Sequence, residues 1–370
     1  MTHSDRLPFK LNYWLLPLAW IYGFVVFVRN TLFDWGWIGS EEFDVPVFCV
    51  GNIAAGGTGK TPHVEYLTRL LSSKYQVAVL SRGYKRKTKG FILLNDTNLP
   101  HMVGDEPYQI KKEFPQAIVA VDSNRRKRIR KLIKLYPKLD VILLDDGFQH
   151  RYVRPQLSVM LVNYNQMPYE DYLLPVGYLR EPYSAARERD NVLVVTKTPE
   201  ELSPIDCRIC MKHLDPYPYQ SVFFSSYKYD MLVPLFPTKQ RTSRPLSSLT
   251  EEESVLLVTG IANPKSLLSD FGKYRSKVNP LVFDDHHDFK QKDIKKIEAH
   301  FSRMQGDSKL IVTTEKDSVR LMTNQYLPEE LKPYIYVLPI QVVLNAGAEF
   351  DKIFMDYVRK NKRHHRVPKA

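Results

Sequence analysis

Cysteine is scarce in this 370-residue chain, and the three that occur, Cys49, Cys207 and Cys210, are an odd number. An odd and sparse set cannot form a disulfide framework, which indicates a reducing, cytosolic environment for the main body of the protein. Cys207 and Cys210 form a Cys-x-x-Cys pair, but no second Cys/His pair follows at the spacing of a zinc site. The sequence therefore gives little support to a zinc or redox centre.

The sequence also lacks internal repeats and low-complexity tracts. Apolar residues make up 44% of the chain and charged residues 25%, a composition that excludes a disordered or collagen-like protein. The length is sufficient for two folded domains. Lys and Arg number 53 against 41 Asp and Glu, so the formal net charge is +12 and we expect an anionic partner. Nucleic acid, an acidic membrane surface and a phosphorylated substrate all fit this charge.

Charge is missing from one stretch near the amino end. Residues 11–28 have no charged side chain, are rich in Trp, Phe and Tyr, and are flanked by Lys10 and Arg29. A membrane-spanning helix needs roughly 20 apolar residues, and aromatic residues suit the lipid–water interface. No small-residue cleavage site follows, which disfavours a cleaved signal peptide. We expect a membrane-associated helix within residues 1–32 that spans the membrane or lies on it; the alternative is a buried core helix.

From residue 45 onward, short β-branched runs alternate with helical segments. This alternation predicts βαβ units and a largely parallel sheet. The expected strands of the first part are residues 46–50, 76–80, 117–121, 141–144, 158–162 and 192–196. A proline-rich, irregular stretch at 198–220 predicts a domain boundary, and a second α/β stretch follows it. We expect a core domain at 33–215 and a smaller second domain with a basic tail at 216–370.

Residues 47–62 have the pattern of a strand, a glycine-rich turn and a helix start, which is the context of a phosphate-binding loop (P-loop). In such a turn, backbone N–H groups converge on phosphate oxygens, Lys60 would bind the β- and γ-phosphates, and the Thr61 hydroxyl would ligate Mg²⁺. The strict G-x-x-x-x-G-K-[ST] pattern fails at one position, because Ala54 stands where the first glycine would fall. The residues expected to bind nucleotide are Gly56, Gly57, Thr58, Gly59, Lys60 and Thr61. An ordinary glycine loop before a helix is the alternative.

A P-loop enzyme also needs an acidic group near the metal, at the end of a neighbouring hydrophobic strand. Asp145 and Asp146 directly follow the hydrophobic run 141–144. One of them would hold Mg²⁺, directly or through water, and the other would orient or neutralise the site. Two adjacent acids are also common at turns, so this assignment depends on the P-loop.

The group that activates an acceptor has two candidate locations. Asp105 and Glu106 follow Gly104 and precede an expected helix, where a carboxylate could face the γ-phosphate; a helix N-cap is the alternative. The acidic and histidine-rich run 284–288 includes His286, which could accept a proton or support a carboxylate that does. A metal-ligand cluster and a solvated loop are its alternatives.

Arginines stand at the expected ends of strands or in the loops beyond them, where ligands of open α/β sheets bind. Arg82 and Arg180 could each clamp a phosphate, and Glu181 follows Arg180 directly; surface ion pairs are the alternative. The basic run 124–131 has the charge of a nucleic-acid patch, but it lacks interleaved aromatic residues and carries a buried-type Ile/Leu stripe. A solvated or membrane-facing helix explains it better.

These residues together resemble the tetraacyldisaccharide 4′-kinases of lipid A biosynthesis. The resemblance covers most of the chain in order, beginning with the hydrophobic amino-terminal segment and the P-loop. The further motifs are Ser81-Arg82-Gly83-Tyr84, Gly104-Asp105-Glu106-Pro107, Asp145-Asp146-Gly147-Phe148-Gln149-His150, Leu179-Arg180-Glu181-Pro182, Gly260-Ile261-Ala262-Asn263-Pro264, Asp285-His286-His287 and Thr314-Glu315-Lys316-Asp317. The family's P-loop is similar at Ala54, so the departure from the strict pattern is expected there.

The resemblance implies Mg²⁺-dependent transfer of the γ-phosphoryl group of ATP to the 4′-hydroxyl of a tetraacylated disaccharide 1-phosphate, giving lipid IVA. It implies an α/β fold with a RecA-like P-loop core, a smaller second domain over the cleft, and an amino-terminal helix on the cytoplasmic face of the inner membrane. Carried over by motif, Lys60 and Thr61 bind triphosphate and metal, Asp145 and Asp146 are the Walker B acids, and Asp105 supported by His286 is the base. Arg180 and Glu181 lie near the active site in the family.

Two other classes of function are compatible with parts of the sequence. A P-loop NTPase acting as a metallochaperone or regulator would hydrolyse nucleotide without a lipid and would need a Cys/His metal site. A basic membrane- or nucleic-acid-binding module would leave Lys60 and Asp145 without a role. The kinase accounts for the +12 charge through ATP, an acylated disaccharide phosphate and an anionic membrane surface. We therefore expect no nucleic-acid partner, and we infer no protein partner.

Overall fold

The structure is a computed structural model that describes residues 11–229, 231–237, 241–261, 264, 267–268, 271–272, 277–285, 287–306 and 308–361. Its larger sheet has nine strands in the order β15-β8-β7-β6-β1-β5-β2-β4-β3. Neighbouring strands are parallel except at the two edges, where β15 and β3 are antiparallel to their neighbours. The strands are β1 (Val47–Gly51), β2 (Val77–Ser81), β3 (Ile92–Leu93), β4 (Ile118–Val121), β5 (Val141–Asp145), β6 (Leu157–Asn163), β7 (Val192–Thr196), β8 (Ser221–Tyr229) and β15 (Ile340–Leu344). The P-loop α/β fold with a mainly parallel sheet, predicted from sequence, is confirmed.

Helices cover both faces of this sheet. On one face, α2 (Lys60–Ser72), α4 (Asp105–Glu113) and α11 (Gly347–Asn361) share one hydrophobic cluster with β1 and β5. On the other face lie α5 (Arg125–Leu135), α6 (Tyr183–Arg187) and α7 (Pro204–Leu214). The short α3 (Pro100–Val103) precedes α4. The continuous burial of the central strands follows from this coverage, and it explains why they lack polar alternation.

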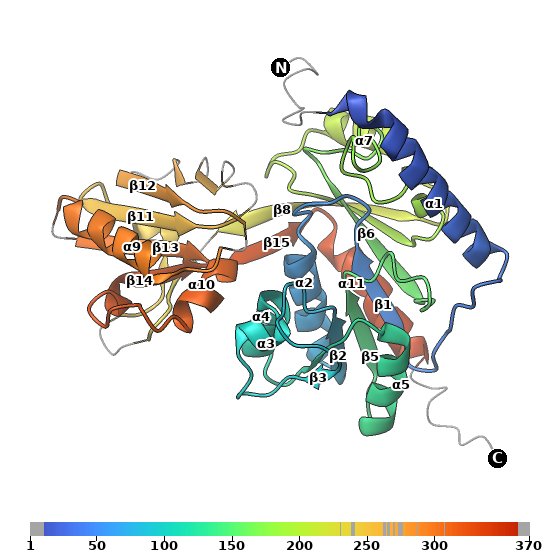
Figure 1. The fold of residues 1–370 in the computed structure, drawn as a ribbon, viewed down its shortest axis with the longest axis horizontal. Coiled ribbons are helices and arrows are strands. Elements are labelled where there is room, and N and C mark those ends of the chain that lie inside the picture. The colour runs from blue at the N-terminus through green and yellow to red at the C-terminus, as the bar shows by residue number, and fades with distance from the viewer. Residues whose placement is uncertain are drawn as a thin grey trace.

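The smaller sheet has six strands in the order β10-β9-β14-β13-β11-β12, with the last four parallel to one another. Figure 1 shows this sheet beside the larger one, with α9 and α10 next to it. Its strands are β9 (Met231–Pro234), β10 (Arg244–Pro245), β11 (Glu253–Thr259), β12 (Lys277–Val282), β13 (Ser308–Thr314) and β14 (Ile335–Leu338). The helices with bounds in the described part of this domain include α9 (Gln291–Arg303) and α10 (Glu315–Met322). Short 3-10 turns occur at Tyr13–Leu15, Leu246–Ser248 and Lys332–Tyr334.

The two sheets are joined by β8 and β15, which pair antiparallel and lie between them in Figure 1. The chain leaves the larger sheet through β8 and returns to it through β15 and α11, whose Phe350 and Phe354 are fully buried in its core. The sequence division at 215/216 assigned β8, β15 and α11 to the second domain; their strand pairing and packing place them with the larger sheet. The sequence division differs from the structure because the chain returns to the larger sheet at residue 340, more than 100 residues after it leaves that sheet at the end of β8. No local sequence pattern indicates this return.

Helix α1 (Leu16–Asp34) exposes most of its large apolar residues and buries only Ala19, Asn30 and Phe33. Large apolar residues face outward, and Trp20 is 72% exposed, while Asn30 on the inner side is only 6% exposed. The segment Tyr13–Asp34 is long and apolar enough to cross a membrane, by length and composition. A buried core helix, which was the alternative, would bury its apolar residues, so this reading is wrong. Lys10, its expected cationic flank, lies outside the described residues.

Candidate active site

The P-loop connects the buried strand β1 to the start of α2. Its carbonyls point toward neighbouring side chains: the Thr196 hydroxyl donates to the carbonyl of Thr58 over 2.9 Å, and Lys197 Nζ donates to the carbonyl of Gly57 over 2.5 Å. Loop carbonyls held in this way leave the backbone N–H groups near the helix start available to an anion. The loop therefore has the form of a phosphate-binding site.

The turn into α2 depends on Gly59. Its φ is +84°, a left-handed conformation that an L side chain adopts only with strain, and its carbonyl accepts a hydrogen bond of 2.8 Å from His63 Nδ1. Burial lowers the pKa of His63 to about 4, so the imidazole is neutral near pH 7. The other ring nitrogen lies 3.0 Å from Ser225 Oγ on β8, which fixes the imidazole between loop and sheet.

Two cationic side chains converge on Asp146. Lys60 Nζ lies 3.7 Å from Asp146 Oδ1 and 3.3 Å from Asn52 Oδ1, and Arg180 Nη1 lies 3.7 Å from the same Asp146 oxygen. Thr61, the second residue of α2, follows Lys60 at the helix start. The structure therefore brings together Lys60, Arg180 and an acid that the sequence placed on three separate segments.

Asp145 ends β5 beside the P-loop strand, because the parallel register of β1 and β5 pairs Val50 with Asp145. Its Oδ2 accepts a 2.9 Å hydrogen bond from Ser81, whereas the buried Oδ1 has no hydrogen-bond partner among the described residues. Burial, followed by the neighbouring charge of Asp146, raises the pKa of Asp145. A carboxylate oxygen that is buried and unpaired beside a second acid fits a hard cation such as Mg²⁺.

The two acids at the start of α4 have different partners. Asp105 Oδ2 accepts two hydrogen bonds from Arg320 of α10, over 3.0 and 2.5 Å, and so connects the core to the smaller domain. Glu106 is close enough to Asp145 and Lys60 for their charges to act on it. Burial and then Asp145 raise the pKa of Glu106 to about 7, while Lys60 opposes the shift. Glu106 therefore interacts electrostatically with the P-loop residues, and Asp105 is paired with Arg320 at the contact between the domains.

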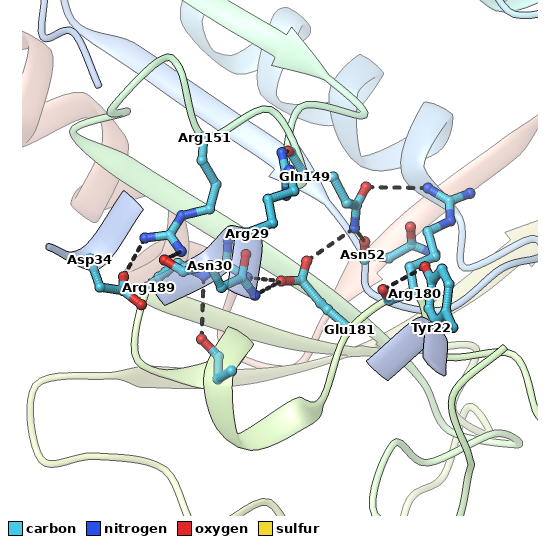
Figure 2. Close-up of polar contacts among 11 residues, drawn as sticks. Tyr22, Arg29, Asn30, Asp34, Asn52, Gln149, Arg151, Arg180, Glu181 and Arg189 are labelled. Carbon is cyan, nitrogen blue, oxygen red and sulfur yellow. Dashed lines mark hydrogen bonds and ion pairs between the residues drawn. The ribbon is translucent and has the colours of Figure 1, made fainter. Parts of the chain in front are cut away.

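The remaining predicted site residues are Arg82, Glu181 and His286. Arg82 is exposed directly after β2, and its charge acts on Arg125 and His150. Glu181 is buried, forms an ion pair with Arg189, and lies beneath α1 (Figure 2). His286 lies outside the described residues.

The acidic run around position 286 makes ordinary ion pairs where it is described. Asp285 pairs with Lys316 over 2.8 Å, and His287 Nε2 lies 3.0 Å from Asp293. Within the described part of the chain, no group of three or more His, Cys, Asp or Glu side chains is arranged to hold a metal ion. A metal in the P-loop site would thus need ligands beyond carboxylates, such as Thr61, water or phosphate oxygens.

Four further side chains reach the site without having been assigned a role from sequence. Asn52 accepts from Lys60, and Gln149 Nε2 donates to the carbonyl of Asn52 over 2.7 Å. Arg125 of the basic helix α5 is buried, and its Nη2 donates to the carbonyl of Asp145 over 3.3 Å. Arg320 reaches Asp105 from the smaller domain. The position of Gln149, three residues after Asp146, could have indicated from sequence that it lies near the site. No comparable sequence feature indicated Arg125 or Arg320.

Comparisons with known proteins agree with this geometry. A family model described as Tetraacyldisaccharide-1-P 4'-kinase (LpxK) matches residues 11–359. The Tetraacyldisaccharide 4'-kinase of Bacteroides thetaiotaomicron is 47% identical over 369 residues, covering 97% of this chain and 97% of that protein. The protein of the same name from Porphyromonas gingivalis is 41% identical over 353 residues, covering 94% and 96%. The crystal structure of "apo" form LpxK from Aquifex aeolicus in complex with ATP matches with a TM-score of 0.72 and 28% identity, covering 94% of this chain and 99% of that one.

Proposed function

The chain belongs to the tetraacyldisaccharide 4′-kinase family, and we propose from this premise how its own residues transfer the γ-phosphoryl group of ATP to the 4′-hydroxyl of tetraacyldisaccharide 1-phosphate. The product is lipid IVA, an intermediate of lipid A biosynthesis. The observation that carries the proposal is the convergence of Lys60 and Arg180 on Asp146 at the P-loop. Phosphoryl transfer needs positioning and charge neutralisation more than covalent chemistry, and this cluster supplies both.

We propose that Lys60 and the N–H groups of residues 56, 57 and 59–61 bind the triphosphate, whereas the N–H of Thr58 donates to the Gly56 carbonyl. The two cations beside Asp146 would neutralise the charge on the transferring group, Lys60 from the start of α2 and Arg180 from the loop after Leu179. Arg180 can approach a phosphate in a bidentate manner that Lys60 cannot match. On this reading Arg180 contacts phosphate, whereas Glu181 beside it does not.

We propose that Thr61, Asp145 and Asp146 hold Mg²⁺ when the nucleotide binds. The unpaired Oδ1 of Asp145 supports this, because a buried carboxylate oxygen without a donor is costly unless a cation or a proton occupies it. The bound cation would neutralise negative charge between the β- and γ-phosphates. Ser81 keeps Asp145 in place by its hydrogen bond to Oδ2.

We propose that Asp105 accepts the proton of the 4′-hydroxyl as the sugar oxygen bonds to the γ-phosphorus. The bond between the γ-phosphorus and the β,γ-bridging oxygen breaks in the same step, and ADP leaves with that electron pair. The two hydrogen bonds from Arg320 fix the orientation of Asp105. His286 would support this carboxylate, as the family resemblance suggests.

We propose that the exposed apolar side of α1 places the enzyme on the cytoplasmic face of the inner membrane, where its acylated substrate is found. Exposed aromatic residues in this region support the proposal, because aromatic side chains suit a lipid interface. They are Tyr13, Trp14, Trp20, Phe24, Phe27, Trp35 and Trp37. The basic tail beyond residue 361, a further possible lipid contact, lies outside the described residues. Flotation of the purified protein with anionic phospholipid vesicles tests this placement; protein that stays at the bottom of the gradient would contradict it.

The kinase assay uses detergent micelles that contain tetraacyldisaccharide 1-phosphate, with Mg·ATP, and measures a lipid product that has gained one phosphate. We expect Lys60→Ala and Asp105→Asn each to lower turnover by about 100-fold or more, since a charge-stabilising group and a general base each contribute at least this much. Lys74→Ala and Asp96→Asn are matched controls, because both side chains are exposed and neither residue belongs to a site motif. A folded wild-type protein that forms no such product would refute the kinase; a fully active Asp105→Asn would refute only the base.

A further inference from the structure

Helix α1 carries polar side chains on the side that faces the protein. Tyr22, Arg29 and Asn30 are spaced by seven and eight residues, so they lie on one face of the helix. We infer that α1 is a positioning element of the active site in addition to its outward apolar face: its inner polar residues hold the backbone that braces the P-loop. The inference builds on the proposed kinase, since nucleotide binding is its readout.

The first contact route runs from α1 to residues 178–181, called here the bracing segment. The Tyr22 hydroxyl donates to the carbonyl of Arg180 over 2.8 Å, and Asn30 Nδ2 lies 3.5 Å from Glu181 Oε2 (Figure 2). Burial raises the pKa of Tyr22, so its hydroxyl keeps the proton that it donates. Glu181 is 3% exposed and is also held by Arg189. The bracing segment is therefore fixed from the α1 side by one buried and one partly buried polar contact.

The opposite edge of the bracing segment pairs with the P-loop itself. The backbone N–H of Ala55 donates to the carbonyl of Tyr178, and the N–H of Arg180 donates to the carbonyl of Ile53, each over 2.7 Å. Between them, Ala54 and Leu179 form an antiparallel bridge. Residues 53–55 of the P-loop are thus one strand of a short ladder, and α1 holds the other strand in place.

A second route reaches the P-loop through Gln149. Arg29 Nη2 donates to the Gln149 carbonyl over 2.7 Å, and Gln149 Nε2 donates to the carbonyl of Asn52 over 2.7 Å and approaches Glu181 Oε1 at 3.4 Å. Asn52 in turn accepts from Lys60. Figure 2 shows these side chains lying between α1 and the loop. The two routes start on different α1 residues and end on adjacent loop residues, so displacement of α1 would disturb the phosphate site through both.

This arrangement predicts that loss of an inner-face contact weakens nucleotide binding, although Tyr22, Arg29 and Asn30 donate to residues 180, 149 and 181 and not to the P-loop itself. We propose to measure the affinity of a fluorescent ATP analogue for the full chain in micelles, for wild type, Tyr22→Phe and Arg29→Met. Tyr22→Phe removes one hydrogen bond, and we expect about threefold weaker binding; Arg29→Met removes a charged donor, and we expect about tenfold. Thermal unfolding of each variant, followed by circular dichroism, shows that it is folded.

Tyr183→Phe is the matched control. The Tyr183 hydroxyl also donates to a backbone carbonyl, that of Leu214, over 2.7 Å, and this hydrogen bond joins neither α1 nor Gln149 to the P-loop. If Tyr22 had only a structural role, Tyr22→Phe and Tyr183→Phe would lower the free energy of unfolding by similar amounts and would leave the nucleotide affinity unchanged. Unchanged affinity in folded Tyr22→Phe and Arg29→Met would overturn the inference. Wild-type protein that binds the analogue but phosphorylates no lipid would instead count against the proposed kinase and leave the inference standing.

Discussion

The P-loop geometry makes a specific prediction about Gly59. A Cβ atom at this position would lie 1.8 Å from the hydroxyl oxygen of Tyr227 and 3.1 Å from its Cζ. The residue also has φ of +84°. Gly59→Ala therefore strains the backbone and also brings the new methyl group into collision with Tyr227. Gly57→Ala in the same loop causes no such collision, because the nearest atom to its Cβ would be Lys197 Nζ at 3.8 Å.

The magnitudes can be worked separately for the two effects. The left-handed conformation costs an L residue about 1–2 kcal/mol. Forcing a methyl group into a filled space costs about 1–3 kcal/mol, because neighbouring groups must shift. We expect Gly59→Ala to lower the free energy of unfolding by about 2–5 kcal/mol, a large share of the stability of a typical domain. Gly57→Ala should change it by less than about 1 kcal/mol.

A second substitution separates the collision from the strain. The Tyr227 hydroxyl is buried and has no hydrogen-bond partner among the described residues, so Tyr227→Phe should change stability little by itself. Combined with Gly59→Ala it removes the colliding oxygen, and we expect recovery of about 1–3 kcal/mol, with the backbone strain remaining. Urea unfolding in micelles, followed by circular dichroism, measures the wild type and the four variants. Equal stability of Gly59→Ala and Gly57→Ala, or no recovery in the double variant, would show that the loop does not have this geometry.

Two further predictions concern the contact between the domains. Burial first, and then the charge of nearby Glu113, raise the pKa of Glu315 from 4.5 to about 7, and that of Glu65 also lies well above its usual value. Because the folded pKa of Glu315 is raised, the contribution of this group to stability is fully present below pH 4.5 and is lost as pH rises through about 7. Glu315→Gln should remove part of this loss, on the order of 1–3 kcal/mol at pH 8 and almost nothing at pH 4, measured by urea unfolding at both pH values. Identical pH profiles for variant and wild type would contradict it. Arg320→Met removes both donors to Asp105 and should lower kcat by about tenfold or more with little change in the KM for ATP; a change confined to KM would place Arg320 in nucleotide binding instead.

Local patterns determined much of the fold and of the nucleotide site. The strand expected at 192–196 is found at Val192–Thr196, and that at 76–80 is found at Val77–Ser81. The glycine-rich turn followed by Lys60 predicts its own anion site, because a helix start and its glycines are contiguous in sequence. The uncharged stretch 11–28 likewise predicted α1 from composition alone, although not which side of the helix faces the protein.

The domain limits were less accessible from sequence. Residues 216–370 have α/β patterning throughout, so nothing local separates β15 and α11 from the strands before them. Their membership in the larger sheet is decided by pairing with β8 and by packing against α2. The order of the strands in the sheet is likewise not visible in local sequence. β1 lies between β6 and β5, and the pairing of β1 with β5 brings Asp145 to the P-loop.

The sequence by itself therefore determined the elements and the chemistry that each can offer: a phosphate-binding turn, acids after a hydrophobic strand, and an apolar helix. Only the tertiary structure decided which of these groups meet. Arg180 joins Lys60 at Asp146, Arg320 reaches Asp105 across 215 residues of sequence, and the inner face of α1 braces the P-loop. The physical reason is range: turns and helix starts depend on backbone preferences within a few residues, whereas an ion pair depends on where two distant segments pack.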